Sequence, residues 1–118
     1  MKDCAKYKDH IIIGPMEKIT ITSNGAGKQI LARIDTGATK SSIDSKLAAE
    51  LMLGPIRRTK IVKSASGTSL RPMIEGEIEL EGKKIKGEFT IADRTHMKYK
   101  VLIGRDIIKN GYLVDPNK

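Results

Sequence analysis

The chain has 118 residues, of which 39% are hydrophobic and 31% are charged. This balance is typical of a folded domain rather than a disordered tail, and no wholly apolar run is long enough for a transmembrane helix. The net charge of +8, from 22 basic and 14 acidic residues, is compatible with nucleic-acid or acidic-membrane binding, and equally with solubility alone. We expect one domain over residues 1–118, with residues 1–9 as a flexible N-terminus.

The residues that usually bind metals or form disulfides are few and isolated. The single cysteine, Cys4, excludes an internal disulfide framework and favours a reducing cytoplasm. Because His10 and His96 stand alone, we expect neither a metal site nor another cofactor. No apolar signal segment follows the first residues, so we expect a cytoplasmic protein with no membrane partner. The aromatic residues are too far apart to form the stacking surface of an RNA-recognition sheet, so nucleic-acid binding rests on charge alone.

The first third of the chain has the pattern of short strands. Isoleucine and valine cluster in runs that end at Gly, Asn, Ser or Pro, which is typical of β-structure. We expect strands at Ile11–Ile13 and Lys18–Ser23, a turn at 24–27, and a returning strand at Gln29–Ile34 that completes a hairpin.

Helix signals occur at two places. Ser45–Leu53 contains good helix formers, with Asp44 as a plausible N-cap and Gly54 as a stop. Near the C-terminus, Asp106–Asn110 is expected to form a second short helix, which Gly111 ends.

The clearest strand signal is a hairpin over 72–92. Four residues on its first arm share one face and are apolar or glycine: Ile74, Gly76, Ile78 and Leu80. Glutamates alternate with them on the other face, where Lys84 and Lys86 of the second arm can pair with the glutamates across the strands. We interpret these charges as a solvated hairpin face, and the whole chain as mostly β with one or two short helices.

One acidic residue stands at the end of the second strand, in Asp35-Thr36-Gly37-Ala38. Glycine lets the backbone turn sharply, so the Asp35 carboxylate is presented at the strand end rather than inside the sheet. Thr36 can hydrogen-bond inward to lock the turn, and the Gly37 amide can donate to the carboxylate. Taken alone, the triplet fits a capped β-turn equally well.

Two further segments give this triplet a context. Val101–Ile103 leads into Gly104 and Arg105 before the second helix, and Ser64–Thr68 reads as a small-residue hairpin tip that could move as a lid. In this order, a strand end with Asp-Thr-Gly-Ala, a glycine-containing flap and an apolar-apolar-Gly-Arg-Asp segment resemble the retropepsin-like aspartic proteases. The resemblance extends over about 11–116, nearly the whole chain.

The chain is also similar to a branch of that family labelled ATP-dependent zinc proteases, which are often encoded beside ATP-grasp ligases. Its members share the Asp-Thr-Gly-Ala start, the Arg71-Pro72 pair, and endings like Leu102–Arg105 and Leu113–Pro116. The zinc label finds no support in these residues, because the chain has no His-Glu-x-x-His motif.

The resemblance implies a closed-barrel acid-protease fold and a homodimer in which Asp35 of each chain is catalytic. Peptide hydrolysis by carboxylates needs two of them, and this chain has one Asp-Thr-Gly. The resemblance further assigns a grip across the dimer axis to Thr36 and the floor of the cleft to Gly37 and Ala38. The flap over a peptide or unfolded-protein substrate would consist of Ser64, Ala65, Ser66, Gly67 and Thr68.

In this family a segment near the C-terminus supports the active-site loop. In this chain that segment contains Ile103, Gly104 and Arg105. Thr39 stands where retroviral members have an acid that pairs with the arginine. We therefore expect Arg105 to pair with Asp106 or a main-chain carbonyl. The tail from residue 112 on, with its proline and charges, is poor material for the interleaved terminal strands of retroviral dimers.

Two other functions stay open. The chain could keep the retropepsin fold without proteolysis and bind peptides or an acidic polymer made by a neighbouring ligase. The basic residues beside the flap suit an acidic ligand, although a solvated edge would carry the same charges: Arg57, Arg58, Lys60 and Lys63. Nucleic-acid binding is the third hypothesis, which a steep loss of binding with added salt would favour.

Overall fold

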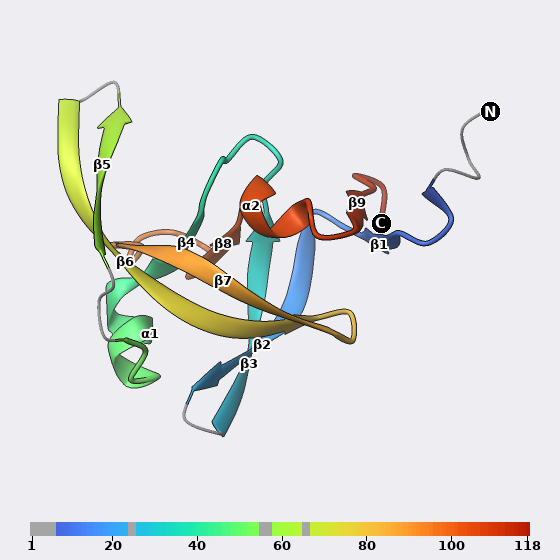
Figure 1. Ribbon diagram of the computed structural model, residues 1–118, viewed down its shortest axis with the longest axis horizontal. Helices are drawn as coiled ribbons and strands as arrows, with labels where there is room; N and C mark the ends of the chain where they lie inside the picture. The colour runs from blue at the N-terminus through green and yellow to red at the C-terminus, as the bar shows by residue number, and fades with distance from the viewer. Residues whose placement is uncertain (1–6, 24–25, 55–57, 65–66) are drawn as a thin grey trace.

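The computed structural model describes residues 7–23, 26–54, 58–64 and 67–118 of the chain (Figure 1). The elements in chain order are β1 Ile11–Ile13, β2 Met16–Ser23, β3 Ala26–Ile34, β4 Ser41–Asp44, α1 Ser45–Glu50, β5 Arg58–Ser64, β6 Gly67–Leu80, β7 Lys83–Ala92, β8 Val101–Ile103, α2 Arg105–Ile108 and β9 Tyr112–Val114. Of the predicted N-terminal segment, residues 1–6 lie outside this description, and the amide of His10 donates to Tyr7 O in a turn (2.9 Å).

The strands close into a barrel. Their order is β2-β3-β8-β4-β7-β6, and β6 pairs again with β2 to complete the ring. Among the described strands β5 pairs with β6 alone, and β5 projects from the barrel as an arm together with the first part of β6 (Figure 1). β1 and β9 form a separate parallel sheet at the opposite side. The expectation of a mostly β, closed-barrel fold with short helices is confirmed.

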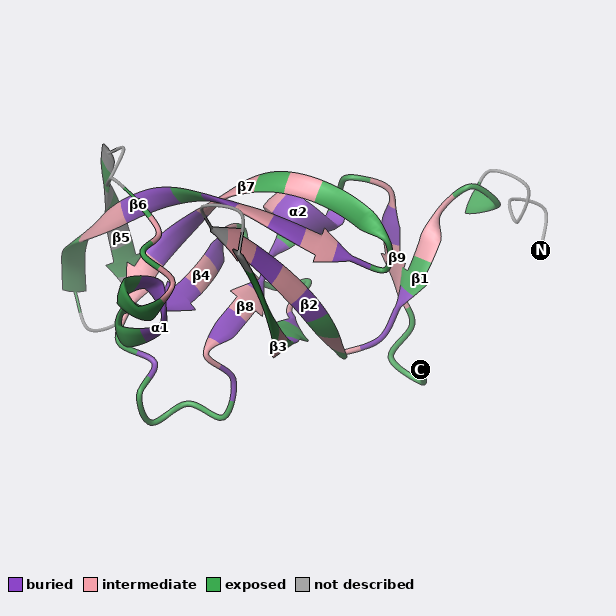
Figure 2. Cartoon of the chain, turned by 90° about the horizontal axis from the view of Figure 1, so that it is seen from below, coloured by how far each residue is buried: buried purple, intermediate pink, exposed green. Residues whose placement is uncertain are grey.

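The barrel interior is built from aliphatic side chains on alternating strand positions, as the period-2 pattern requires. Ile19, Ile21, Ile43, Ile78 and Phe89 are fully buried there. In Figure 2 buried residues run along the barrel strands, whereas the described side chains of β5 and of the adjoining end of β6 are exposed. These exposed positions of the arm add nothing to the core, which suits a segment that moves relative to the barrel.

The hairpin of β6 and β7 follows its sequence pattern closely. Its turn consists of Glu81 (φ 50°) and Gly82 (φ 78°), the two left-handed residues that a type I′ turn requires. Glu77 lies opposite Lys86 and Glu79 opposite Lys84, as the alternation predicts. The first hairpin also forms, with arms longer than expected, and its turn residues 24–25 lie outside the description.

Helix α1 begins where the sequence predicts and ends earlier. The Asp44 carboxylate accepts hydrogen bonds from the amides of Lys46 (3.2 Å) and Leu47 (3.4 Å), an N-cap as expected. The helix ends at Glu50 rather than at residue 53, because Met52 adopts a left-handed backbone (φ 54°). The amide of Leu53 then donates to Ala48 O (3.0 Å), which closes a Schellman motif.

Replacing Met52 by glycine is expected to raise the free energy of unfolding by about 0.5–1 kcal/mol, because glycine adopts the left-handed conformation without strain. The Met52 side chain is 74% exposed, so little packing is lost. Urea unfolding midpoints measure the change. Met97→Gly is the control: Met97 is also exposed but has no positive φ, so glycine there should destabilise the protein.

Tyr112 in β9 joins the C-terminal strand to the barrel. Its hydroxyl donates to Leu80 O (2.8 Å), and the ring is buried. Burial, with a smaller contribution from the charge of Glu81, raises the pKa of Tyr112 to about 12. The folded state therefore holds the phenolic proton to higher pH than the unfolded chain does.

Stability is expected to fall as the pH rises from about 10 toward 12. In this range the unfolded chain releases the Tyr112 proton while the folded chain retains it, so unfolding becomes more favourable with each step of pH. Unfolding midpoints across that range test this. Tyr112→Phe should be less stable at neutral pH but should lose less stability above pH 10; an identical alkaline slope in both proteins would contradict the assignment.

Candidate active site

Asp35 lies directly after β3, at the start of the loop that leads to β4. Its amide donates to Ile103 O in β8 (2.8 Å), which continues the parallel pairing of the two strands by one residue. The Gly37 amide donates to Asp35 Oδ1 (2.9 Å), as predicted from the triplet. The amide of Ala38 donates to Asp35 O (3.2 Å), so the backbone turns back at once and the partly exposed carboxylate stays at the barrel end.

Thr36 does not make the inward hydrogen bond that the sequence predicted for it. Its side chain is exposed and has no hydrogen bond within the described residues, so it does not lock the turn from inside. The reason is geometric: the Gly37 amide and the Asp35 backbone already close the turn. Thr36 is left exposed at the surface of the loop.

The segment from β8 into α2 holds the Asp35 loop by main-chain hydrogen bonds. The amide of Arg105 donates to Ala38 O (2.8 Å), and the amide of Asp106 donates to Thr39 O (3.2 Å). Gly104 lies so close to this loop that a Cβ atom there would be 2.7 Å from Lys40 O and 2.9 Å from Ala38 O. The role predicted for Gly104, close backbone approach, therefore has a specific geometric basis.

A buried serine completes this support and was not predicted from the sequence. Ser41 Oγ donates to Asp106 Oδ1 (2.8 Å) and accepts from the Gly104 amide (2.9 Å). The amide of Ser41 donates to Asp106 Oδ2 (3.3 Å). Both ends of the loop, at residues 35 and 41, are thus tied to the β8–α2 segment, which fixes where Asp35 stands.

Arg105 pairs differently from the expectation. Its guanidinium Nη2 donates to Thr39 Oγ1 (3.0 Å), not to Asp106 or to a main-chain carbonyl. Asp106 is already engaged by Ser41 and by the amide of Ile107 (3.0 Å). Thr39, which stands where retroviral members have an acid, therefore still contacts Arg105, through a neutral hydroxyl.

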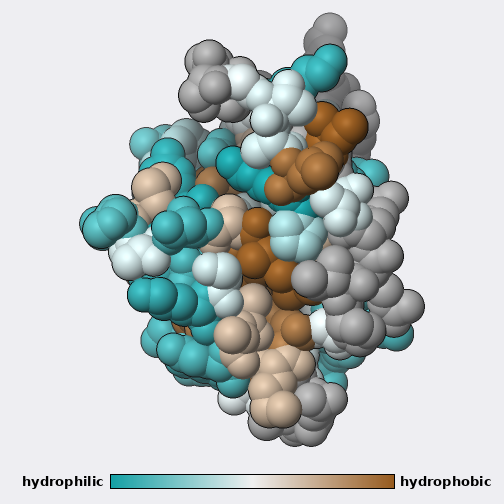
Figure 3. Space-filling model, turned by 90° about the vertical axis from the view of Figure 1, so that its left-hand side faces the viewer, coloured by the Kyte–Doolittle hydropathy of each residue, from teal (hydrophilic) through white to brown (hydrophobic). Residues whose placement is uncertain are grey.

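The predicted flap lies at the end of the projecting arm. Ser64 at the end of β5 pairs with Gly67 at the start of β6, and Ala65 and Ser66 between them lie outside the described residues. Gly67 has a left-handed backbone (φ 125°), and Thr68 is exposed on the next position of β6. Hydrophobic surface gathers near this arm and across the middle of the same face, bordered on one side by hydrophilic side chains (Figure 3).

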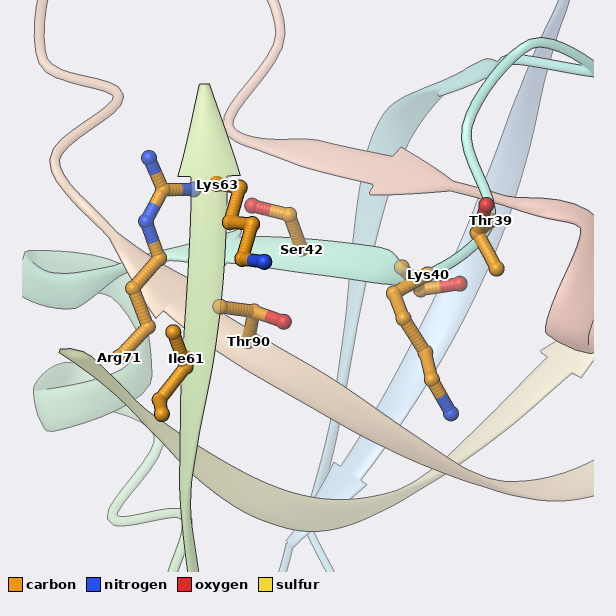
Figure 4. A pocket seen from close by; sticks show the side chains of 8 residues that line it. Thr39, Lys40, Ser42, Ile61, Lys63, Arg71 and Thr90 are labelled. Carbon is orange, nitrogen blue, oxygen red and sulfur yellow. The ribbon is translucent and has the colours of Figure 1, made fainter. Parts of the chain in front are cut away.

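A pocket of about 310 Å³ lies between this arm and the Asp35 loop (Figure 4). Its lining residues come from the loop, β4, the arm and β7: Thr39, Lys40, Ser41, Ser42, Ile61, Lys63, Arg71 and Thr90. The arm therefore faces the far part of the Asp35 loop, at Thr39 and Lys40, and Asp35 itself is not among the residues that line this pocket. Of the basic stretch predicted beside the flap, only Lys63 has a described side chain, and it lines this pocket.

A second, mostly apolar hollow of about 380 Å³ adjoins Thr36. It is lined by Thr36 and Arg105 of the site and by residues of α2, β9 and the segment joining them: Ile108, Lys109, Tyr112, Leu113 and Val114. Thr36, which is exposed, is thus continuous with an apolar surface.

The described residues show neither a metal-binding cluster nor a membrane-spanning helix. Within the described ranges, no three His, Cys, Asp or Glu side chains are grouped closely enough to hold a metal ion. His10 instead contacts the Tyr7 ring edge-on, with centroids 5.5 Å apart. In the same ranges, no helix has the length and apolar character needed to cross a bilayer.

A closed barrel with an Asp-Thr-Gly loop at one end, held by a Gly-Arg-Asp segment, defines the retropepsin-like class of aspartic proteases. The family comparison agrees. The chain belongs to the RimB-like family, whose description is "Retropepsin-like aspartic endopeptidase RimB" and whose model matches residues 44–118. The matched region contains the projecting arm and the β8–α2 segment, and Asp35 precedes it. The resemblance inferred from the sequence is confirmed.

One curated relative and several solved structures are similar to this chain. A Shewanella pealeana protein named "Probable alpha-L-glutamate ligase" is 30% identical over 132 residues; the alignment covers 91% of this chain but only 29% of that protein's length. A Legionella pneumophila protein of unknown function, Lpg0085, superposes with a TM-score of 0.64 at 23% identity, covering 91% of this chain and 94% of that one.

Two viral proteases share the fold. The EIAV protease, solved with the inhibitor HBY-793, has a TM-score of 0.65 at 22% identity and covers 81% of this chain and 86% of its own. The simian foamy virus protease has a TM-score of 0.60 at 16% identity and covers 80% and 91%. At these identities the likeness concerns the fold.

Proposed function

We propose that the protein is an aspartic endopeptidase that acts as a homodimer in the cytoplasm. The observation that carries the proposal is the placement of Asp35: a partly exposed carboxylate at the barrel end, oriented by the Gly37 amide at 2.9 Å and held by the β8–α2 segment. The single cysteine of the chain, Cys4, is consistent with the reducing cytoplasm.

In the proposed reaction the Asp35 carboxyls of two chains lie side by side and share one proton, because like charges that close cannot both ionise. The ionised carboxylate takes a proton from a water molecule, whose oxygen attacks the peptide carbonyl carbon. The protonated carboxyl gives its proton to the carbonyl oxygen. When the tetrahedral intermediate collapses, the carboxyl that took the water proton gives it to the amide nitrogen, and the other carboxylate takes a proton back from a hydroxyl of the intermediate. The C–N bond breaks, and an acid and an amine are released while the pair again shares one proton.

A second copy of the chain is needed because the sequence contains one Asp-Thr-Gly. An isologous two-fold dimer brings the same loop of each copy to the axis. The exposed residue Thr36 and the apolar hollow that it adjoins suit such a contact, since both are continuous with the Asp35 loop. The tail does form a strand, β9, but it pairs with β1 of its own chain, so interleaving of terminal strands is not part of this proposal.

The substrate in this proposal is an extended peptide or an unfolded protein. It would lie between the Asp35 loop and the projecting arm, whose backbone can bind it as an added strand. Ile61 and Leu70 of the arm are exposed, so the arm could lift to admit a chain.

The dependence of activity on protein concentration tests this proposal. Cleavage of an unfolded protein and a mixed peptide library is measured from about pH 3 to 7, with the oligomeric state followed by sedimentation. Specific activity should rise with protein concentration in parallel with the dimer fraction. Activity that is constant across a range in which the chain is monomeric would contradict the dimeric mechanism.

The second candidate is a retropepsin-fold module that binds peptides or an acidic polymer without cleaving them. The observation that favours it is the basic lining of the pocket below the arm, together with a relative named as a glutamate ligase. Under this alternative a folded dimer would bind a glutamate-rich peptide but leave it intact, and Asp35→Asn would not change the affinity.

A further inference from the structure

Strand β9 has one edge with which no described strand pairs. It lies between β1 and helix α2 (Figure 1), and among the described strands its partner is β1. Gly111 O accepts a hydrogen bond from β1 (2.9 Å) and the Asp115 amide donates one to β1 (2.8 Å). Every second residue of this segment, 111, 113 and 115, therefore turns its main-chain groups toward β1. The N–H and C=O groups of Tyr112 and Val114 face the other edge, which we call the free edge of β9.

The apolar hollow of about 380 Å³ lies along this free edge. It is lined by all three residues of β9 and by Ile108 of α2, whereas no residue of β1 lines it. Thr36 of the Asp35 loop forms part of the same wall. An unpaired strand edge is a template for pairing with another strand. A strand bound here would contact both β9 and the loop that carries Asp35.

The surface around the hollow carries charges of both signs. Lys109 lines the hollow and Asp115 directly follows β9; both are exposed, and neither forms an ion pair with another described residue. When two identical strands pair antiparallel, the end of each lies beside the start of the other. Asp115 of one copy would then lie near Lys109 of the other, because Lys109 stands shortly before β9 in the chain. The surface is thus complementary to itself, as an isologous contact requires.

We propose that the free edge is covered by β9 of a second copy, paired antiparallel about the two-fold axis of the dimer. The inference rests on the proposed homodimer and adds to it the surface through which the copies meet. The register that uses all of the free main-chain groups places Tyr112 opposite Val114 at both ends, with each pair exchanging two hydrogen bonds. Leu113 then faces Leu113 of the other copy on the axis.

The resulting sheet has the strand order β1-β9-β9-β1, and no terminal strand is exchanged between the copies. Ile12 lies beside Leu113 in the register of β1 and β9 and is 42% exposed. Across the joined sheet the two Leu113 side chains lie between the two Ile12 side chains, in one row on one face. Aliphatic neighbours on a sheet face stabilise strand pairing.

A cysteine on the axis tests this register. In a Cys4→Ser background, Leu113→Cys should form a disulfide-linked dimer on mild oxidation, because its two Cα atoms would be about 4.5 Å apart, within disulfide reach. Val114→Cys in the same background is the matched control, since its two copies would be about 7–8 Å apart and should link about tenfold more slowly. Circular dichroism checks that both variants fold. Equal rates of linking in the two variants would overturn the inference.

Charge reversals supply a second test that needs no cysteine. Lys109→Glu and Asp115→Lys should each weaken the dimer about tenfold in sedimentation, because like charges then meet at both ends of the contact. Mixed in equal amounts, the two variants should form heterodimers, since each end then joins opposite charges. Lys84→Glu, an exposed reversal on β7, should leave dimerisation unchanged. A mixture that dimerises no better than either variant alone would contradict the proposed contact.

The linked dimer separates this inference from the peptidase proposal. If the Leu113→Cys dimer forms selectively and neither it nor the wild type cleaves any peptide, the contact stands and the peptidase proposal fails. If the wild type has dimer-dependent activity but Leu113→Cys links no faster than Val114→Cys, the copies meet elsewhere and the inference fails. When both proposals hold, the linked dimer should cleave with a specific activity that no longer depends on protein concentration.

Discussion

Replacing Asp35 by asparagine is expected to lower the rate of peptide cleavage about a thousandfold or more, because the amide can neither take a proton from water nor share one with its partner. Asparagine has the same shape and keeps an oxygen for the Gly37 amide, which now lies 2.9 Å from Oδ1. The fold should therefore survive, and unfolding midpoints should change little. Initial rates on the best library peptide measure the loss.

The chain offers a matched control for this substitution. Asp93 also accepts a hydrogen bond from the amide two residues further on, that of Thr95 (3.0 Å), but it is exposed and distant in sequence from the barrel-end loop. Asp93→Asn makes the same chemical change in the same kind of turn and should leave the cleavage rate unaffected. Full activity in Asp35→Asn would show that this carboxylate does no chemistry.

Mixed dimers sharpen the same experiment. If wild-type and Asp35→Asn chains exchange freely in equal amounts, about a quarter of the dimers contain two carboxylates. Activity should then fall with the square of the wild-type fraction. A linear fall would mean that each Asp35 works independently of the one in its partner, which contradicts a shared-proton pair.

The sequence predicted the parts of the fold in which local and global preferences agree. The hairpin over 72–92 has strict alternation and a Glu81-Gly82 turn with the left-handed conformations that its register requires. The position of Asp35 was predictable for the same reason, because an apolar strand pattern that ends in Asp-Thr-Gly places the acid at the end of the strand.

The parts that were missed are held by contacts distant in sequence. β4 and β9 are short strands with no alternation of their own, and β4 forms because β8 and β7 flank it on both sides. The link from Ser41 to Asp106 joins residues 65 positions apart, so neither residue marks it locally. Helix α1 ends early because Met52, a residue that rarely adopts a positive φ, does so here.

The turn at Asp35 was thus predictable from the sequence, whereas the contacts from the β8–α2 segment that hold it were not. Asp35 and Gly37 act on each other within one turn, which the sequence describes. The partner of Arg105 depended on how α2 packs on the loop, and only the fold brings Thr39 Oγ1 within 3.0 Å. A sequence motif therefore locates a candidate catalytic residue, here Asp35, more readily than the residues that position it.

Gly104→Ala is expected to destabilise the protein by about 3 kcal/mol and to lower the cleavage rate of the folded fraction about a hundredfold. The added Cβ would lie 2.7 Å from Lys40 O, 2.8 Å from Lys40 C and 2.9 Å from Ala38 O, all main-chain atoms. Since backbone cannot rotate away as a side chain can, the loop after Asp35 must shift, and the hydrogen bond from the Arg105 amide to Ala38 O lengthens. A carboxylate displaced by even about 1 Å loses its alignment with the other copy.

Gly76→Ala is the control that separates steric displacement from a general effect of alanine in a strand. Gly76 is buried in β6, but a Cβ there would meet only the Phe89 ring, at 3.4 and 3.6 Å, which is ordinary contact. Its unfolding free energy should change by less than about 1 kcal/mol and its cleavage rate by less than about twofold. Urea unfolding gives the first quantity and kcat/KM, corrected for folded protein, gives the second. If Gly104→Ala unfolds more easily yet cleaves at the wild-type rate when folded, the β8–α2 segment stabilises the barrel without positioning Asp35.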